Sequence, residues 1–198
     1  MNQRELAPIA AEERARADHY ALLSRLFHSP PDATLLATLA ASGRAIVAAD
    51  GDLARAWSEL ASAAGAFDQQ AVREEYERLF IGTGRPAIFL YGSYYQAGFL
   101  MEEPLAELRQ DLATLGFARL AGVGESEDHI AALADVMRHL IVAGVAVERQ
   151  RAFFARHLQT WVERLADQLE AASAAFYPSV GRLLRSYCAI EVEAFSMA

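Results

Sequence analysis

Three residues of the kinds that carry out acid–base chemistry lie close together in the sequence. Glu125, Asp128 and His129 place two carboxylates and an imidazole on one short segment. A carboxylate beside an imidazole can move protons in a reaction. His129 and His139 could also be considered as metal ligands, but their separation does not place them on adjacent helical turns, as an H-E-x-x-H pair requires. An enzyme that uses Asp128 and His129 with a metal or a nucleotide is therefore one hypothesis.

The same residues also suit a structural role. Ser126 is of a type preferred at helix N-caps, so the sequence predicts a helix that begins there, with Glu127 and Asp128 in its first turn. Acidic residues in a first turn stabilise a helix by roughly 0.3–1 kcal/mol. The apolar face of this helix recurs at steps of three and four: Ile130, Leu133, Met137, Leu140 and Ile141. Residue types alone favour this structural interpretation over catalysis.

A second stretch, Tyr76–Met101, begins with helical periodicity and then loses it. The apolar face of its helical part consists of Val72, Tyr76, Leu79 and Phe80. Gly82, Gly84 and Pro86 then end the helix, because glycine tolerates positive φ and proline has no N–H. From Pro86 to Met101 no residue is charged and five are Phe or Tyr. We expect this segment to lie across the core, with tyrosine hydroxyls at its wet edge, either as a binding loop or as an inert connector.

Both stretches resemble signatures of one family. The first reads Tyr76–x–x–Leu79–Phe80–x–Gly82–x–Gly84, followed by Tyr91–Gly92–Ser93–x–Tyr95, and the second reads Glu125–x–Glu127–Asp128–His129–Ile130. In this order they resemble the TorD/DmsD family of cytoplasmic chaperones for molybdenum-containing redox enzymes exported by the twin-arginine route. The chain departs from the family pattern at Thr83 and Ser126, where the family often has proline.

The resemblance implies a chaperone without catalytic activity or cofactor. Its partners would be the twin-arginine leader and the unfinished catalytic subunit of an exported molybdoenzyme. Phe80, Tyr91 and Tyr95 would line an apolar groove, Glu125 and Asp128 would meet the leader arginines, and His129 would orient Asp128 or contact the peptide backbone. The full set of peptide-binding residues implied in this way is Leu79, Phe80, Gly82, Gly84, Tyr91, Ser93, Tyr95, Glu125, Asp128 and His129. A helical adaptor that binds another protein through the aromatic loop is the remaining alternative.

The composition and the positions of helix-breaking residues predict an all-α fold. Of the 198 residues 54% are hydrophobic and 22% are charged, which indicates one folded domain over residues 1–198. We expect about ten helices in a compact arrangement, many of them short. Gly43 should close the second helix, Gly65 should break the third, and Pro178 should interrupt the chain before the last helix. The other predicted boundaries are Ala11–Phe27, Asp52–Ala64, a start near Gln69, and a helix that starts at Glu102-Glu103-Pro104 and ends at Gly116.

Charge and hydropathy restrict the partners further. The net charge of −8 disfavours nucleic acid and suits a basic peptide. The first twenty residues lack an apolar core typical of a signal peptide, and the longest apolar run, Leu140–Val147, is too short to span a bilayer. We therefore expect a cytoplasmic protein without membrane insertion, either a monomer or a dimer.

Overall fold

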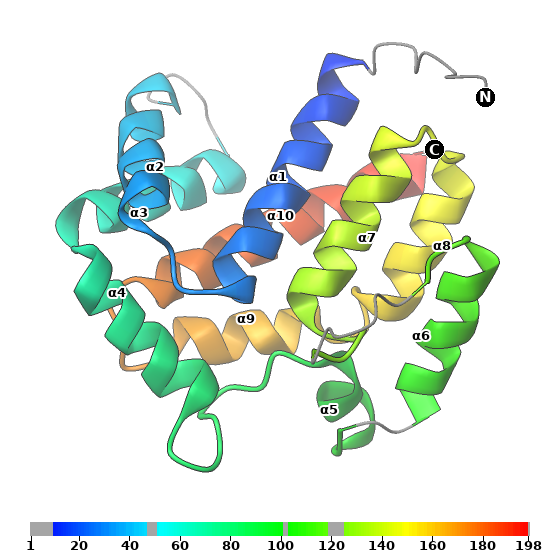
Figure 1. Ribbon diagram of the computed structural model, residues 1–198. Helices are drawn as coiled ribbons and strands as arrows, with labels where there is room; N and C mark the ends of the chain where they lie inside the picture. Colours follow the sequence, from blue (N-terminus) through cyan, green and yellow to red (C-terminus); the bar gives the residue numbers. More distant parts are fainter. Residues whose placement is uncertain (1–9, 47–50, 101–102, 119–124, 198) are drawn as a thin grey trace, which may run out of the picture.

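The computed structural model describes residues 10–46, 51–100, 103–118 and 125–197. In these ranges the chain forms ten α-helices and one π-helical turn, with no β-strand (Figure 1). The helices are α1 (Ala11–His28), α2 (Ala33–Ile46), α3 (Asp52–Ala66), α4 (Gln69–Tyr76), the π turn η1 (Glu77–Ile81), α5 (Gly92–Ala97), α6 (Glu103–Thr114), α7 (Ile130–Val142), α8 (Val147–His157), α9 (Val162–Glu170) and α10 (Tyr177–Met197). The predicted all-α fold of about ten helices in one compact domain is confirmed.

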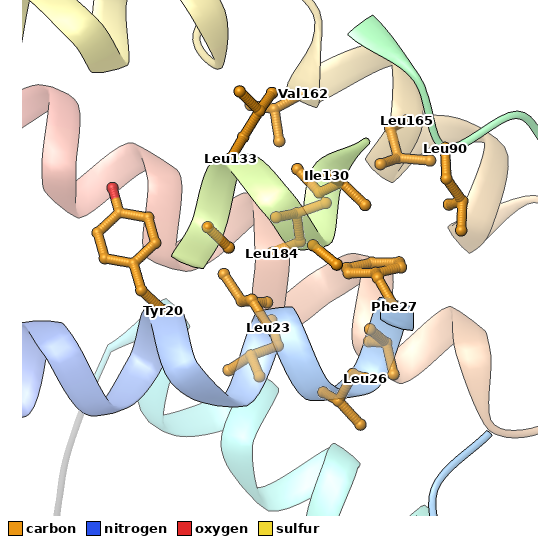
Figure 2. Packing of buried hydrophobic residues seen from close by; sticks show 14 of the residues in the cluster. Tyr20, Leu23, Leu26, Phe27, Leu90, Ile130, Leu133, Val162, Leu165 and Leu184 are labelled. Carbon is orange, nitrogen blue, oxygen red and sulfur yellow. The ribbon is translucent and has the colours of Figure 1, made fainter. Parts of the chain in front are cut away.

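The core lies where α1 packs along α7 and where α9 and α10 pack against each other. Figure 2 shows side chains from these four helices converging on one interior. They include Tyr20, Leu23, Leu26, Phe27, Ile130, Leu133, Val162, Leu165 and Leu184, all of which are buried. Burial of apolar surface stabilises a fold by roughly 25 cal/mol per Å². In Figure 1 the α2–α3 pair lies at one end of the molecule, and α6 and α8 lie at the other.

Two glycines that we predicted to end helices lie inside them. Gly43 is within α2, and a Cβ on it would stand 2.8 Å from the Cβ of Ala61. Gly65 is within α3, where its nearest neighbour would be Ala40 at 3.6 Å. The two predictions are wrong because both glycines lie where α2 and α3 pack against each other, and at Gly43 this contact leaves little room for a side chain.

The start of α10 is held from a distant helix. Glu75 on α4 is buried, and its carboxylate accepts hydrogen bonds from the backbone N–H groups of Ala175 (2.7 Å), Phe176 (3.0 Å) and Tyr177 (2.6 Å). These N–H groups have no partner within a helix, so an acceptor is needed. Pro178 does not interrupt the chain before α10, as we predicted, but lies in its first turn, where proline is tolerated.

Among the residues described here, no helix combines the length and the hydropathy that crossing a bilayer requires.

Candidate functional site

The glycines of the first signature shape the loop after α4. In η1 the Gly82 N–H donates to the Glu77 carbonyl oxygen (2.8 Å), and Gly82 has a φ of 63°. A Cβ at Gly82 would stand 2.3 Å from the carbonyl oxygen of Arg85, so no other residue type fits. Gly84 also has positive φ, but the space around its Cβ position is open. The helix therefore ends at Gly82, as predicted.

Alanine substitutions at Gly82 and Gly84 test the difference in space around their Cβ positions. We expect Gly82→Ala to lower the free energy of unfolding by about 3 kcal/mol, because strain from positive φ adds to the clash with the Arg85 carbonyl. Gly84→Ala should cost only about 1 kcal/mol, because only the backbone preference is lost. Urea unfolding followed by circular dichroism measures both. Equal losses in the two variants would show that the contact with Arg85 is unimportant.

Most of the aromatic and apolar residues of the first signature belong to the core. Leu79 is buried, and Phe80 packs against Phe27, Tyr76 and Tyr177 with ring centroids 4.8–6.3 Å apart. Both side chains therefore lie in the core.

Tyr95 is buried in the same way. Its ring stacks on Trp161 with centroids 5.3 Å apart. Its hydroxyl lies 2.9 Å from the Phe89 carbonyl oxygen and 2.8 Å from Oε1 of Gln168. The assignment of Leu79, Phe80 and Tyr95 to peptide binding stays a prediction, and their observed contacts are those of side chains that support the loop.

The two signatures meet at what we call the loop junction, residues 90–93 and 125–130. The Ile130 N–H donates to the Leu90 carbonyl oxygen (2.8 Å), and the Gly92 N–H donates to the Asp128 carbonyl oxygen (2.9 Å). Tyr91 and His129 thereby form an isolated antiparallel bridge. Segments more than thirty residues apart in the sequence are thus fixed side by side, and Tyr91, Ser93, Glu125, Asp128 and His129 come together in one place.

Asp128 is the buried acid of the loop junction. Its side chain is only 4% exposed, and Oδ2 accepts hydrogen bonds from the backbone N–H (2.9 Å) and the hydroxyl (2.5 Å) of Ser93. Ser93 is in the first turn of α5, so Asp128 stabilises the start of α5 rather than that of α7. Oδ1 of Asp128 is also buried and has no hydrogen-bond partner within the described residues.

The predicted start of the following helix is wrong. Neither Ser126 nor the first-turn positions assigned to Glu127 and Asp128 belong to α7, which begins at Ile130 with His129 as its N-cap. Residues 128–130 pair with residues 90–92 instead, and this pairing holds the His129 backbone extended. A residue held in an extended strand-like pair cannot also be helical, so the helix starts later than its N-cap signal indicates.

His129 caps α7 with its side chain. Its Nδ1 accepts the backbone N–H of Ala131 at 3.1 Å, which places the ring proton on Nε2. Burial lowers the pKa of His129 to about 4, although the nearby carboxylates of Glu125 and Asp128 act to raise it. At neutral pH the imidazole is therefore neutral and fixed, with its ring edge-on to Tyr91 at a centroid distance of 5.1 Å.

The lowered pKa predicts an acid-sensitive fold. An unfolded histidine has a pKa near 6.5, so the unfolded chain takes up a proton first as the pH falls. The contribution of His129 to stability is complete above about pH 6.5 and is lost as the pH falls towards 4, amounting to about 2 kcal/mol by pH 5. His129→Asn keeps a capping acceptor without a titrating ring and should remove this part of the pH dependence. Chemical unfolding of the wild-type and His129→Asn proteins at pH 7.5 and pH 5 measures this difference. If the free energy of unfolding depends on pH identically in the two proteins, the prediction is contradicted.

Glu125 supplies the exposed acid of the loop junction. The Tyr91 hydroxyl donates to Oε2 of Glu125 at 2.6 Å. Burial raises the pKa of Tyr91, and the hydrogen bond to Glu125 raises it further. Burial also raises the pKa of Tyr76 to about 12, with a smaller contribution from the Glu125 charge. Of the two acids predicted to bind the peptide, Asp128 is thus buried and Glu125 is exposed, and each accepts a hydrogen bond from a hydroxyl group.

A cavity that borders the loop junction was missed by sequence reasoning. It has a volume of about 350 Å³, and among its lining residues Glu127 forms an ion pair with Arg109 on α6 (Oε2 to Nη2, 2.9 Å). No motif indicates this cavity, because its walls are ordinary apolar residues that only the tertiary structure brings together. Within the described ranges, no three His, Cys, Asp or Glu side chains are grouped as metal ligands.

The described residues thus form an all-helical fold in which an acidic junction joins an aromatic loop to a capped helix. The fold is similar to the crystal structure of an Archaeoglobus fulgidus protein described as a redox enzyme maturation protein, with a TM-score of 0.55 and 19% identity over 94% of this chain and 98% of that one. Residues 47–167 match the family described as the nitrate reductase delta subunit, and the chain belongs to this family.

Curated relatives named Chaperone protein TorD match as well. The protein from Vibrio cholerae serotype O1 is 26% identical over 121 residues, which is 55% of each chain. The protein from Vibrio parahaemolyticus is 24% identical over 136 residues, covering 62% of this chain and 63% of that one. The chain thus spans about half the length of the curated relatives it matches, and the predicted resemblance to this family is confirmed.

Proposed function

We propose that this protein is a dedicated maturation chaperone for an exported molybdoenzyme. It holds the unfinished catalytic subunit in the cytoplasm, binds its twin-arginine leader and delays export until the molybdenum cofactor is inserted. Membership of the nitrate reductase delta subunit family and the similarity to proteins named Chaperone protein TorD support this proposal. Because those relatives are named as chaperones, the proposed role is binding rather than catalysis.

The observation that carries the proposal is Oδ1 of Asp128, which has no hydrogen-bond partner among the residues that the structure describes. A buried acceptor without a hydrogen bond costs about 1–3 kcal/mol, so Oδ1 is poised to accept a donor from a ligand. The exposed carboxylate of Glu125 lies on the same junction. An arginine guanidinium carries five N–H donors in a planar fork. One arginine of the leader pair can therefore donate to Oδ1 of Asp128 while the other donates to the carboxylate of Glu125.

The charge and the required reversibility agree with a basic peptide ligand. The net charge of −8 favours encounter with a peptide that carries arginines. A chaperone must also release its client, and an affinity near ~1 µM, or about −8 kcal/mol, permits exchange where a permanent complex would not.

Calorimetry with the leader of a molybdoenzyme encoded in the same operon tests the proposal. The natural leader should bind, and a leader in which both arginines are replaced by alanine should bind at least about tenfold more weakly. Equal heats for the two peptides would contradict leader recognition and would favour an adaptor for another protein. Retention of a stoichiometric metal after dialysis, or turnover of a nucleotide, would favour the enzyme hypothesis.

A further inference from the structure

The cavity beside Glu127 lies between α6 and α7 and has mainly apolar walls. It is open to solvent, has a volume of about 350 Å³ and is lined by Arg109, Leu112, Phe117, Ala118, Glu127, Ala132 and Val136. An engineered cavity of roughly 150 Å³ in another protein is large enough to bind benzene. The α6–α7 cavity is about twice as large, so it has room for two apolar side chains of that size.

The charged residues that line this cavity are Glu127 and Arg109. They form an ion pair with each other, and their side chains are 16% and 50% exposed. Glu127 also lies between Glu125 and Asp128 in the sequence, so one residue that lines the cavity is within two residues of both acids proposed to bind arginine. The cavity therefore borders the loop junction.

We propose that the α6–α7 cavity binds the apolar segment that follows the arginine pair of the leader. This inference rests on the proposed function and deepens it by naming a second subsite. A leader with an apolar segment needs apolar surface next to the acids. The rings of Phe80 and Tyr95 are buried in this structure. Phe117 and Val136 on the cavity wall are only half-buried, so their apolar surface is within reach of a ligand. A helical peptide presents apolar side chains at steps of three and four, and two such anchors match the volume of the cavity.

The charge of its lining distinguishes this cavity from a larger one at the glycine loop. The cavity of about 710 Å³ beside the glycine loop is lined by Arg78 and Arg85 as well as by Glu77. Two arginines at that site would repel an arginine pair or anything held close to it. In the α6–α7 cavity the single arginine, Arg109, is already neutralised by Glu127. The apolar segment of an arginine-bearing peptide therefore fits the α6–α7 cavity better.

Filling the cavity tests the proposal. Ala132 is a half-buried α7 residue on the cavity wall, and Ala132→Phe should fill part of the space. Ala54→Phe is the matched control, since Ala54 is a half-buried helical alanine on α3 at the other end of the molecule. Val136→Gln makes the wall polar without adding bulk and serves as a second variant. Circular dichroism and the thermal midpoint identify variants that remain folded.

Two synthetic peptides separate the subsites. The first has an arginine pair followed by ten Leu and Ala residues, and the second has the same arginine pair followed by ten Ser and Gln residues. Ala132→Phe should weaken binding of the first peptide at least about tenfold and leave the weaker binding of the second unchanged, while Ala54→Phe should change neither. Unchanged binding of the first peptide to Ala132→Phe, with its arginine dependence intact, would overturn the cavity proposal and leave the proposed function standing.

Crosslinking of the unmodified protein gives an independent readout. A photoreactive leucine placed in the apolar segment of the first peptide should attach to residues 109–118 or 132–136, as located by mass spectrometry. Attachment to the glycine loop, residues 82–87, or to other surfaces would overturn the proposal. Failure of the wild-type protein to distinguish arginine from glutamine in the first peptide would overturn the proposed function, and the cavity proposal with it.

Discussion

Replacement of Glu75 by alanine should lower the free energy of unfolding by about 4 kcal/mol or more, because it strips the acceptor from three backbone N–H groups at once. Phe176 and Tyr177 are completely buried, so water cannot readily replace the lost carboxylate. Each buried donor left unsatisfied costs about 1–3 kcal/mol. Glu75 also joins α4, which leads into the glycine loop, to α10, so its loss weakens the support of the candidate site.

Denaturant unfolding with matched variants measures this effect. Glu74→Ala is the control, because Glu74 is the exposed neighbour of Glu75 on the same helix and its carboxylate contacts only Gln70 among the hydrogen bonds described. The control should change stability by less than about 0.5 kcal/mol. Glu75→Gln keeps one acceptor oxygen and should lie between the two. A loss below about 1 kcal/mol for Glu75→Ala would show that the α10 N-terminus finds other partners.

Replacement of Asp128 by asparagine should weaken leader binding by about 30-fold while lowering stability by only about 1 kcal/mol. Asparagine keeps an oxygen that accepts the Ser93 N–H, so the start of α5 remains capped. The asparagine side chain has no negative charge, and its NH₂ group is a donor where the leader arginine needs an acceptor. This expectation rests on the proposed function, because it takes the unpaired Oδ1 as the atom that meets the leader arginine.

Ser93→Ala is the matched control for this prediction. It removes the 2.5 Å hydrogen bond from the Ser93 hydroxyl to Oδ2 of Asp128 and leaves the carboxylate in place. Calorimetry with the natural leader should then show an affinity within about threefold of wild type, although stability falls. If Asp128→Asn and Ser93→Ala reduce binding and stability to the same extent, Asp128 acts as a structural cap and does not bind the arginine.

The geometry of the loop junction favours such specific binding. The two chain segments are joined by backbone hydrogen bonds between Leu90 and Ile130 and between Gly92 and Asp128. Gly92 also packs so closely on Trp161 that a Cβ would stand 3.0 Å from the indole nitrogen. Acids fixed in this way lose little conformational freedom when a ligand binds, and preorganisation of this kind increases affinity.

Local features of the sequence were sufficient for most of the helices. The apolar periodicity of a helix can be read directly from the sequence. Several helix ends are also set by a residue that lies within a few positions in the sequence. Asp68, directly before α4, accepts the Ala71 N–H (2.8 Å), as an N-cap does, and α4 begins at Gln69 as predicted. The prediction at Gly82 also succeeded because a positive φ is a property of that residue and its immediate neighbours.

Contacts between segments far apart in the sequence could not be predicted from local sequence patterns, and the incorrect helix boundaries lie at such contacts. The sequence by itself determined the helical class, the family resemblance and the set of acidic and aromatic residues. Only the tertiary structure decided that Phe80 and Tyr95 are buried, that Asp128 caps α5 while His129 caps α7, and that α6 and α7 enclose a cavity. The physical reason is that a helix follows from residues three and four apart, whereas burial and side-chain pairing depend on how whole helices pack.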